Sequence, residues 1–279
     1  MGTLAAHYLQ QAGTTVHAAL RPALTRHLHT ATSCLTISLL GDDKAPIDYL
    51  WVATKGPDTA SALQALAHRL HSGTTLISLQ NGMGTLAQAP LPQGITLLYA
   101  VTTNAAWREG NKVHLVAENQ TLLGGDLPSA PAWFHPLAAH WPGLAWSERI
   151  HFEQWRKLTI NAVINPLTAM LGCRNGELLH NPKAQAQMVK LSQECDKLAG
   201  HLFPHWPEDT FERSLMVAEA TRDNISSMLA DVLAQRPTEI DFITGYLVRT
   251  AKAHHLHLPT HEALWQQLRE IPAPVDTPK

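Results

Sequence analysis

This sequence has few cysteines and no large excess of either positive or negative charge. Its three cysteines, Cys34, Cys173 and Cys195, are scattered and odd in number and show no CxxC spacing. This pattern argues against a disulfide framework or a zinc site and indicates a reducing compartment. The 21 Lys and Arg residues nearly balance the 23 Asp and Glu residues, so the sequence has no basic stripe of the kind that binds nucleic acid.

Membrane-directing features are also lacking. No early basic stretch precedes an apolar run as in a signal peptide, and no apolar segment is long enough to span a bilayer. We therefore expect a cytoplasmic protein with neither a membrane nor a nucleic acid as partner. The seventeen histidines include the pair His201 and His205, but Pro204 would interrupt the helix needed to align it. No metal site is predicted.

The sequence contains two successive patterns of predicted secondary structure, here called textures. Its 279 residues suit two domains of ordinary size. The first half alternates short β-type runs with helical stretches, which favours a parallel sheet covered on both faces. Candidate strands cover residues 15–20, 49–54, 74–80, 95–102, 112–116 and 121–124, and candidate helices cover 3–12 and 59–71.

The second half is almost wholly helical. Candidate helices cover residues 152–171, 182–201, 209–219, 226–234, 239–254 and 261–270. The predicted fold is therefore α/β, with a Rossmann-like domain over residues 1–145 and an all-helical domain over residues 146–279. Between the textures, Trp133, Trp141 and Trp146 are expected to pack the hinge rather than stack on a ligand.

The start of the chain is unusual for such a domain. A Rossmann domain opens with a strand, a G-x-G-x-x-G turn and a helix that receives the pyrophosphate, whereas this sequence begins with Gly2 and a helix. Gly2 is interpreted either as the last glycine of that fingerprint or as an ordinary start residue. We expect that the first strand is missing, and that a form extended upstream by about ten residues binds NADPH more tightly.

Arg21 follows the strand predicted over residues 15–20 and has no carboxylate beside it. It lies roughly 20 residues after Gly2, which is about the spacing of the residue that reads the ribose 2′ position. An arginine there favours a 2′-phosphate, and therefore NADPH over NADH.

Three polar residues stand in the apolar stretch WRKLTINAVINPLTAM. Lys157, Asn161 and Asn165 are spaced i, i+4, i+8, so on a helix they point along nearly one line. Buried polar groups need partners, which a bound ligand would supply. The alternatives are a solvated lysine and asparagines bonded to backbone. Pro166 is expected to kink the helix near the asparagines.

The sequence resembles the ketopantoate reductases (2-dehydropantoate 2-reductases) over nearly its whole length. The resemblance is carried by TKGPDTASAL, SLQNGMGTL, VTTNAAWREG, WRKLTINAVINPLTAMLGCRNGEL, NISSMLADV and RPTEIDFITGYLV. It implies a Rossmann domain, a helical domain and an active site in the cleft between them. The implied reaction is NADPH-dependent reduction of 2-dehydropantoate to (R)-pantoate, a step toward vitamin B5 and coenzyme A.

The resemblance also implies roles for individual residues on the catalytic side. Lys157 matches the family's catalytic lysine, which would stabilise the negative charge on the ketone oxygen and donate the proton. Glu239, with Thr238 as a possible helix cap, matches an essential acidic residue expected to hold the cofactor ribose and orient the lysine. Its alternative role is to complement a helix dipole. The residues that match the substrate-binding positions are Asn161, Asn165, Ser227 and Asn224.

On the cofactor side, Arg21 matches the family's 2′-phosphate arginine and Lys55 a cofactor-contacting lysine. Asn81 matches an asparagine near the nicotinamide and substrate. Lys55 and Asn81 follow two successive predicted strands, and ligands bind at strand ends in such sheets. The plainer alternatives are a solvated lysine and an Asn-Gly turn.

Two other functions remain open at this stage. One is a related hydroxyacid dehydrogenase, because K-x-x-x-N alone is common to several such enzymes. The other is a truncated, cofactor-poor and inactive homologue. The chain is expected to be a monomer or a homodimer.

Overall fold

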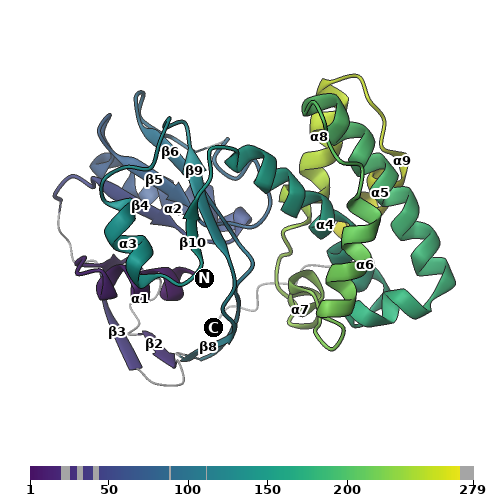
Figure 1. Ribbon diagram of the computed structural model, residues 1–279, viewed down its shortest axis with the longest axis horizontal. Helices are drawn as coiled ribbons and strands as arrows, with labels where there is room; N and C mark the ends of the chain where they lie inside the picture. The colour runs from purple at the N-terminus through teal and green to yellow at the C-terminus, as the bar shows by residue number, and fades with distance from the viewer. Residues whose placement is uncertain (20–25, 30–33, 40–43, 88, 111, 271–279) are drawn as a thin grey trace. The chain divides into compact units, whose positions relative to one another are not determined.

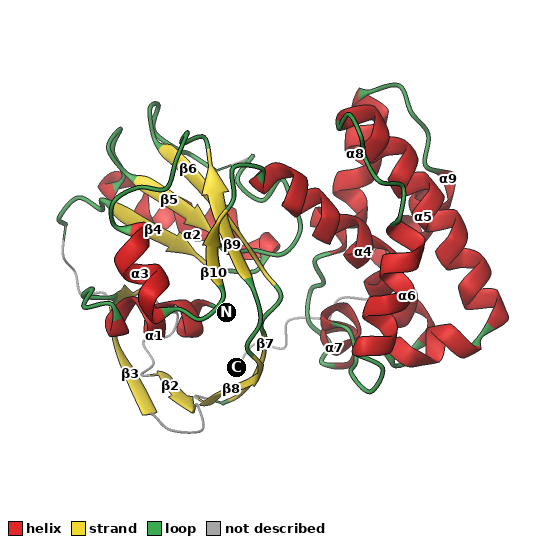
Figure 2. Cartoon of the chain, in the orientation of Figure 1, coloured by secondary structure: helices red, strands yellow, loops and turns green. Residues whose placement is uncertain are grey.

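The computed structural model describes residues 1–19, 26–29, 34–39, 44–87, 89–110 and 112–270. The chain forms two compact units (Figures 1 and 2). The first comprises Met1–Thr54, Asp58–Gln80 and Gln88–Glu153, and the second comprises Lys55–Pro57, Asn81–Ala87 and Gln154–Lys279. Two short segments from the first half of the sequence therefore belong to the second unit. The sequence-based division at residue 145 stays a prediction.

The first unit is built on a mixed sheet with the strand order β10-β9-β6-β5-β4. Strands β4, β5 and β6 run parallel, β9 is antiparallel to β6, and β10 is parallel to β9. The bounds are Tyr49–Val52 for β4, Thr75–Ser78 for β5, Thr96–Thr102 for β6, Thr121–Gly125 for β9 and Leu144–Trp146 for β10. Strand β5 is almost entirely buried, as expected of an inner parallel strand.

A second sheet of the same unit has the order β1-β3-β2-β8-β7. Strands β1 and β3 are parallel, as are β2 and β8, whereas β2 with β3 and β7 with β8 are antiparallel. The bounds are His17–Ala18 for β1, Arg26–His29 for β2, Cys34–Leu39 for β3, Ala105–Glu109 for β7 and Lys112–Ala117 for β8.

The described helices up to residue 140 are α1 (Gly2–Gln11), α2 (Gly56–Leu66), the 3-10 helix η1 (Ala67–Arg69) and α3 (Phe134–His140). Residues of α1 and α3 form an apolar core with residues of the strands, and Leu4, Ile77 and Leu98 are fully buried in it.

The tryptophans near the end of the first texture also belong to this core. Trp141 is 1% exposed and stacks on Tyr8 with 4.9 Å between ring centroids, while Trp133 and Trp146 pack against the same cluster. The expectation that they pack a hinge between domains is therefore wrong. Their large apolar surface is used inside the first unit.

The second unit is helical. Its elements are α4 (Ile150–Leu171), η2 (Asn175–His180), α5 (Pro182–Leu202), α6 (Thr210–Ala220), α7 (Ser227–Leu233), η3 (Ile240–Phe242), α8 (Thr244–Ala253) and α9 (Pro259–Arg269). Local chemistry sets their ends. At the start of α5, Asn181 Oδ1 accepts hydrogen bonds from the amides of Lys183 (3.0 Å) and Ala184 (3.2 Å), and Pro182 occupies the first turn.

The predicted fold class is confirmed, with an α/β first domain followed by a helical one. The extended runs that were predicted correspond to β1, β4, β5, β6, β8 and β9, although β1 covers only His17–Ala18 of the described residues 15–19. Elements β2, β3, β7, β10, α3 and η2 were not predicted. The helix predicted over residues 239–254 is divided into η3 and α8 at Ile243. None of the described helices combines the length and apolarity needed to cross a bilayer.

Candidate active site

Helix α4 carries the polar line predicted from the sequence. Lys157, Asn161 and Asn165 lie on this helix, which continues through Pro166 to its last turn. Most of their neighbours are buried, including Leu158, at 2% exposure, and Asn165 itself is only 9% exposed. A buried carboxamide needs a partner, so this face of α4 suits a polar ligand. The expected kink at Pro166 stays a prediction.

The Lys157 ammonium is held by a side chain from a distant part of the sequence. Its Nζ donates a hydrogen bond to Oδ1 of Asn81 at 2.9 Å. Burial lowers the pKa of Lys157 to about 8, although the Glu239 carboxylate partly opposes this effect. At neutral pH the amine is therefore protonated but is a better proton donor than an ordinary lysine.

Glu239 lies at the start of η3 and is 8% exposed. Its Oε1 accepts a hydrogen bond from the Gly56 amide at 3.1 Å. Burial raises the pKa of Glu239, and the Asp231 carboxylate adds to this, while the Gly56 amide and the charges of Lys55 and Lys157 lower it. Thr238 Oγ1 accepts from the amide of Ile240 at 3.4 Å. The N-cap position of η3 is Glu239 itself, whose side chain makes no capping hydrogen bond, so the expectation that Thr238 is the cap is wrong.

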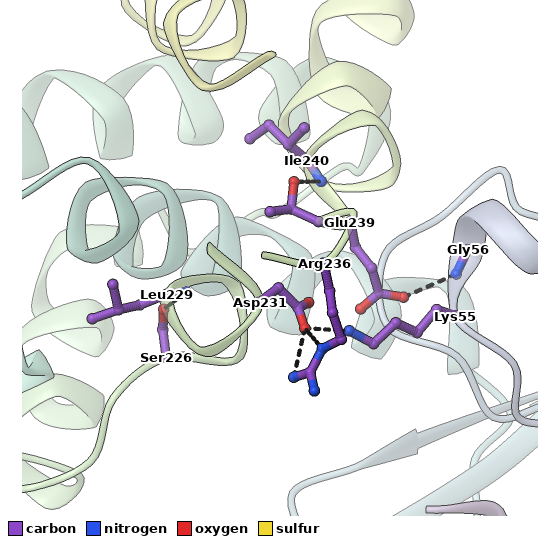
Figure 3. A network of polar contacts seen from close by, with 9 residues as sticks. Lys55, Gly56, Ser226, Leu229, Asp231, Arg236, Glu239 and Ile240 are labelled. Atoms are coloured by element: carbon purple, nitrogen blue, oxygen red, sulfur yellow. Dashed lines mark hydrogen bonds and ion pairs between the residues drawn. The ribbon is translucent and has the colours of Figure 1, made fainter. Parts of the chain in front are cut away.

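Two cations share one buried carboxylate beside Glu239 (Figure 3). Asp231 is 3% exposed, and its Oδ1 accepts hydrogen bonds from Lys55 Nζ and from Arg236 Nε, the latter at 3.1 Å. In Figure 3 the Lys55 side chain also runs beside the Glu239 carboxylate. Opposite charges thus alternate through this cluster, which offsets the cost of burying Asp231.

The start of α7 is fixed to α4 by a pair of hydroxyls. Thr168 donates to Ser226 Oγ at 2.8 Å, and Ser226 caps α7 by accepting from the Leu229 amide at 3.0 Å. The predicted substrate residue Ser227 is the first residue of α7 and is exposed. It therefore follows directly on a residue that contacts α4 one turn from Asn165.

Asn224 also precedes α7 and is exposed. Its backbone carbonyl accepts a hydrogen bond from the Asn175 amide at 3.0 Å, which ties this loop to η2. The role predicted for its side chain stays a prediction.

Two residues predicted to bind the cofactor remain, Arg21 and Gly2. Arg21 is outside the described residues. Gly2 begins α1 in the first unit, where a Cβ would lie 2.9 Å from Cβ of Ala53, just after β4. Such close packing of a helix start against a strand end is the role of the last fingerprint glycine. Because no acidic side chain occupies the first turn of α1, this helix start fits a dinucleotide phosphate.

The sequence did not indicate that Asp231 and Arg236 join Lys55 beside Glu239, nor that Ser226 caps α7 and contacts α4. Asp231 and Lys55 are separated by 176 positions, so no local pattern connects them. Ser226 could have been found, because a serine directly before a helical run is a typical N-cap signal.

Comparison with known proteins agrees with this arrangement. The model of the family described as "Ketopantoate reductase PanE/ApbA" matches residues 1–128. That of "Ketopantoate reductase PanE/ApbA C terminal" matches residues 149–272. The 2-dehydropantoate 2-reductase of Shigella flexneri is 36% identical over 251 residues, which cover 87% of this chain and 81% of the relative. That of Vibrio cholerae is 33% identical and covers 85% of this chain and 86% of the relative.

Solved structures show the same fold. A dimeric ketopantoate reductase from Staphylococcus aureus has a TM-score of 0.86 at 22% identity, covering 97% of this chain and 94% of the other. A D-mandelate dehydrogenase with NADH and anilino(oxo)acetate has a TM-score of 0.84 at 19% identity, covering 97% and 95%.

Proposed function

The chain belongs to the ketopantoate reductase family, and we propose that it reduces 2-dehydropantoate to (R)-pantoate with NADPH, a step toward vitamin B5 and coenzyme A. One observation supports this most directly. Lys157 lies on the helix that also carries Asn161 and Asn165, and its Nζ donates a hydrogen bond to Asn81. Its charge also interacts with that of the buried Glu239. This arrangement supplies a proton donor and amide groups for a keto acid.

Bound NADPH would supply the hydride that adds to the C2 ketone. The chain's own contribution is to the oxygen, where negative charge develops. The Lys157 ammonium stabilises that charge and transfers a proton from Nζ to it. A pKa of about 8 keeps Lys157 protonated at neutral pH while weakening its hold on the proton.

The polar residues around Lys157 would orient the substrate. Asn161 and Asn165 present carboxamides one and two turns further along α4, and Ser227 presents a hydroxyl at the start of α7. We assign these three, with Asn81 and the weaker candidate Asn224, to substrate binding. Amide and hydroxyl groups suit the carboxylate and hydroxyl of ketopantoate as hydrogen-bond partners.

Glu239 is assigned two tasks. Its carboxylate would accept a hydrogen bond from a cofactor ribose hydroxyl, and its charge favours the protonated form of Lys157. Gly56 holds the carboxylate in place through its amide.

For the cofactor, we assign pyrophosphate binding to Gly2 at the start of α1, 2′-phosphate binding to Arg21 and a cofactor contact to Lys55. The preference for NADPH over NADH belongs to this proposal and rests on Arg21. A cytoplasmic location and a monomeric or homodimeric state complete it.

The proposal is tested by following nicotinamide oxidation with a panel of 2-keto acids that includes ketopantoate and benzoylformate, each with NADPH and with NADH. We expect the highest kcat/KM for ketopantoate with NADPH. A higher value for another keto acid would identify a related hydroxyacid dehydrogenase. Absence of cofactor binding at about millimolar NADPH would identify an inactive homologue.

A further inference from the structure

Phe242 contacts both of the short loops that carry polar side chains of the candidate site. We name Lys55–Pro57, which includes the first two residues of α2, the first loop, and Asn81–Ala87 the second loop. Both belong to the same compact unit as Phe242. Phe242 is the last residue of η3, and its amide donates to the carbonyl of Glu239 at 3.0 Å.

The ring of Phe242 packs on the first loop at Gly56. A Cβ at Gly56 would lie 2.8 Å from Cγ and Cε2 of the ring and closer still to Cδ2. Because real Cβ atoms do not approach that closely, only glycine allows this contact. The same glycine donates its amide to Glu239.

The backbone of Phe242 holds the second loop. Its carbonyl accepts a hydrogen bond from the Met83 amide at 2.8 Å. A Cβ at Gly82 would lie 2.5 Å from the same carbonyl oxygen, and Gly82 has a φ of 74°. Both the conformation and the contact therefore require glycine. One turn further on, Tyr246 packs in the same way on Gly84, where a Cβ would lie 2.9 Å from Cδ2.

The two loops share an order of residues that links these contacts to the site. In each loop the polar residue comes directly before the glycine that meets Phe242, as Lys55-Gly56 and as Asn81-Gly82. Fixing the glycine therefore fixes the backbone from which the polar side chain extends. Asn81 in turn accepts the hydrogen bond from Lys157, so its position bears on the proton donor.

We propose that Phe242 is a positioning residue, which holds both loops so that Asn81 meets the Lys157 ammonium and Gly56 meets Glu239. It acts through these residues and touches no reacting atom itself. The importance of such a residue for turnover rests on the proposed function. Small displacements of reacting groups reduce the rate strongly, so a loosened loop is expected to reduce kcat more than binding.

The test compares Phe242→Ala with Phe211→Ala, which truncates another partly buried phenylalanine, on α6. The first measurement needs no substrate. Amine-reactive labelling of Lys157 is followed as a function of pH by mass spectrometry of ligand-free protein. We expect Phe242→Ala to shift the pKa of Lys157 by about one unit, because release of the second loop removes the Asn81 acceptor and changes the burial of the amine. Phe211→Ala should leave this pKa unchanged.

The second measurement is kinetic. For ketopantoate, Phe242→Ala should lower kcat about tenfold and change KM less than about threefold. Phe242→Leu, which keeps an apolar group against Gly56, should fall between it and the unaltered protein, and it takes over both measurements if Phe242→Ala does not fold.

An unchanged pKa of Lys157 in the folded Phe242 variants would overturn the proposal, as would equal losses of kcat in Phe242→Ala and Phe211→Ala. If the unaltered protein does not reduce ketopantoate, the proposed function fails, and the labelling result alone decides whether Phe242 positions Lys157.

Discussion

Lys157 experiences two opposing effects from its surroundings. Burial destabilises the charged amine and lowers its pKa to about 8, while Glu239 stabilises the charge. Glu239 experiences the reverse, since burial raises its pKa and the positive charge of Lys157 lowers it. Each side chain therefore helps to keep the other ionised in an environment that favours neither charge.

This coupling predicts how Glu239→Gln changes the pH dependence of turnover. Lys157 must be protonated to act as an acid, so kcat falls as the pH rises through its pKa. Removing the Glu239 carboxylate removes the effect that raises this pKa, and the alkaline fall of kcat should move to lower pH. The measurement is kcat for ketopantoate as a function of pH.

The control is Glu212→Gln, which removes an exposed carboxylate on α6 and should leave the pH profile of kcat unchanged. An alkaline limb that stays in place or moves to higher pH in Glu239→Gln would refute the coupling.

At the scale of elements, adjacent serines at the start of α7 have different tasks. Ser226 is buried, caps the helix and accepts from Thr168, whereas Ser227 is exposed. Ser226→Ala should lower the free energy of unfolding by about 1 kcal/mol through loss of the cap. Ser227→Ala should leave stability unchanged and raise the KM for ketopantoate about tenfold, because it loses a hydrogen bond to a charged substrate.

Urea unfolding and steady-state kinetics on both variants separate the two roles. If Ser226→Ala instead raised KM while Ser227→Ala left it unchanged, the assignment of Ser227 to the substrate would be wrong.

Helix α9 is joined to α5 by a partly buried carboxylate. Glu194 accepts hydrogen bonds from the amides of Thr260 (2.8 Å) and His261 (3.0 Å), and its Oε2 lies 2.9 Å from His261 Nδ1. On the other side of the ring, His261 Nε2 lies 3.5 Å from Cys195 Sγ. Burial raises the pKa of Glu194, but these hydrogen bonds outweigh it and lower the pKa to about 2.

Glu194→Gln should therefore lower the free energy of unfolding by roughly 2 kcal/mol near neutral pH, as expected for hydrogen bonds to a charged group. Because the folded pKa is depressed, this stabilisation is full above the unfolded pKa and is lost as the pH falls toward about 2. Urea unfolding from neutral to acidic pH measures both effects.

The difference between Glu194→Gln and the unaltered protein should shrink as the pH falls. Glu262→Gln, a carboxylate in the first turn of the same helix α9, should cost much less. A constant difference at all pH values would show that the charge of Glu194 is not responsible.

At the scale of the whole molecule, the features that the sequence predicted correctly are those that depend on local periodicity. The i, i+4, i+8 spacing of Lys157, Asn161 and Asn165 depends only on helix geometry, and the structure places all three on α4. The two-texture division also follows from local pattern. By contrast, β2 pairs with β8, and such non-local pairing leaves little signal in a four-residue strand.

The parts of the site that sequence could not predict depend on long-range contacts. Gly56 and Glu239 are 183 positions apart, and Lys55 and Asp231 are 176 apart. The sequence predicted Phe242 to lie inside a longer helix. In the structure η3 ends at Phe242, and the carbonyl of Phe242 accepts a hydrogen bond from the second loop. Strand β7 could have been predicted from the sequence, because Gly110 is a turn signal before β8; its φ in the structure is 54°.

The most direct test of the account is kcat for ketopantoate reduction with NADPH in Lys157→Ala, with Lys190→Ala, an exposed lysine on α5, as the control. We predict a loss of at least about a hundredfold in Lys157→Ala, as expected for removal of a general acid, with little change in NADPH affinity. The control should match the unaltered protein. Turnover by Lys157→Ala within about tenfold of the unaltered protein would contradict the assignment of Lys157 as the proton donor.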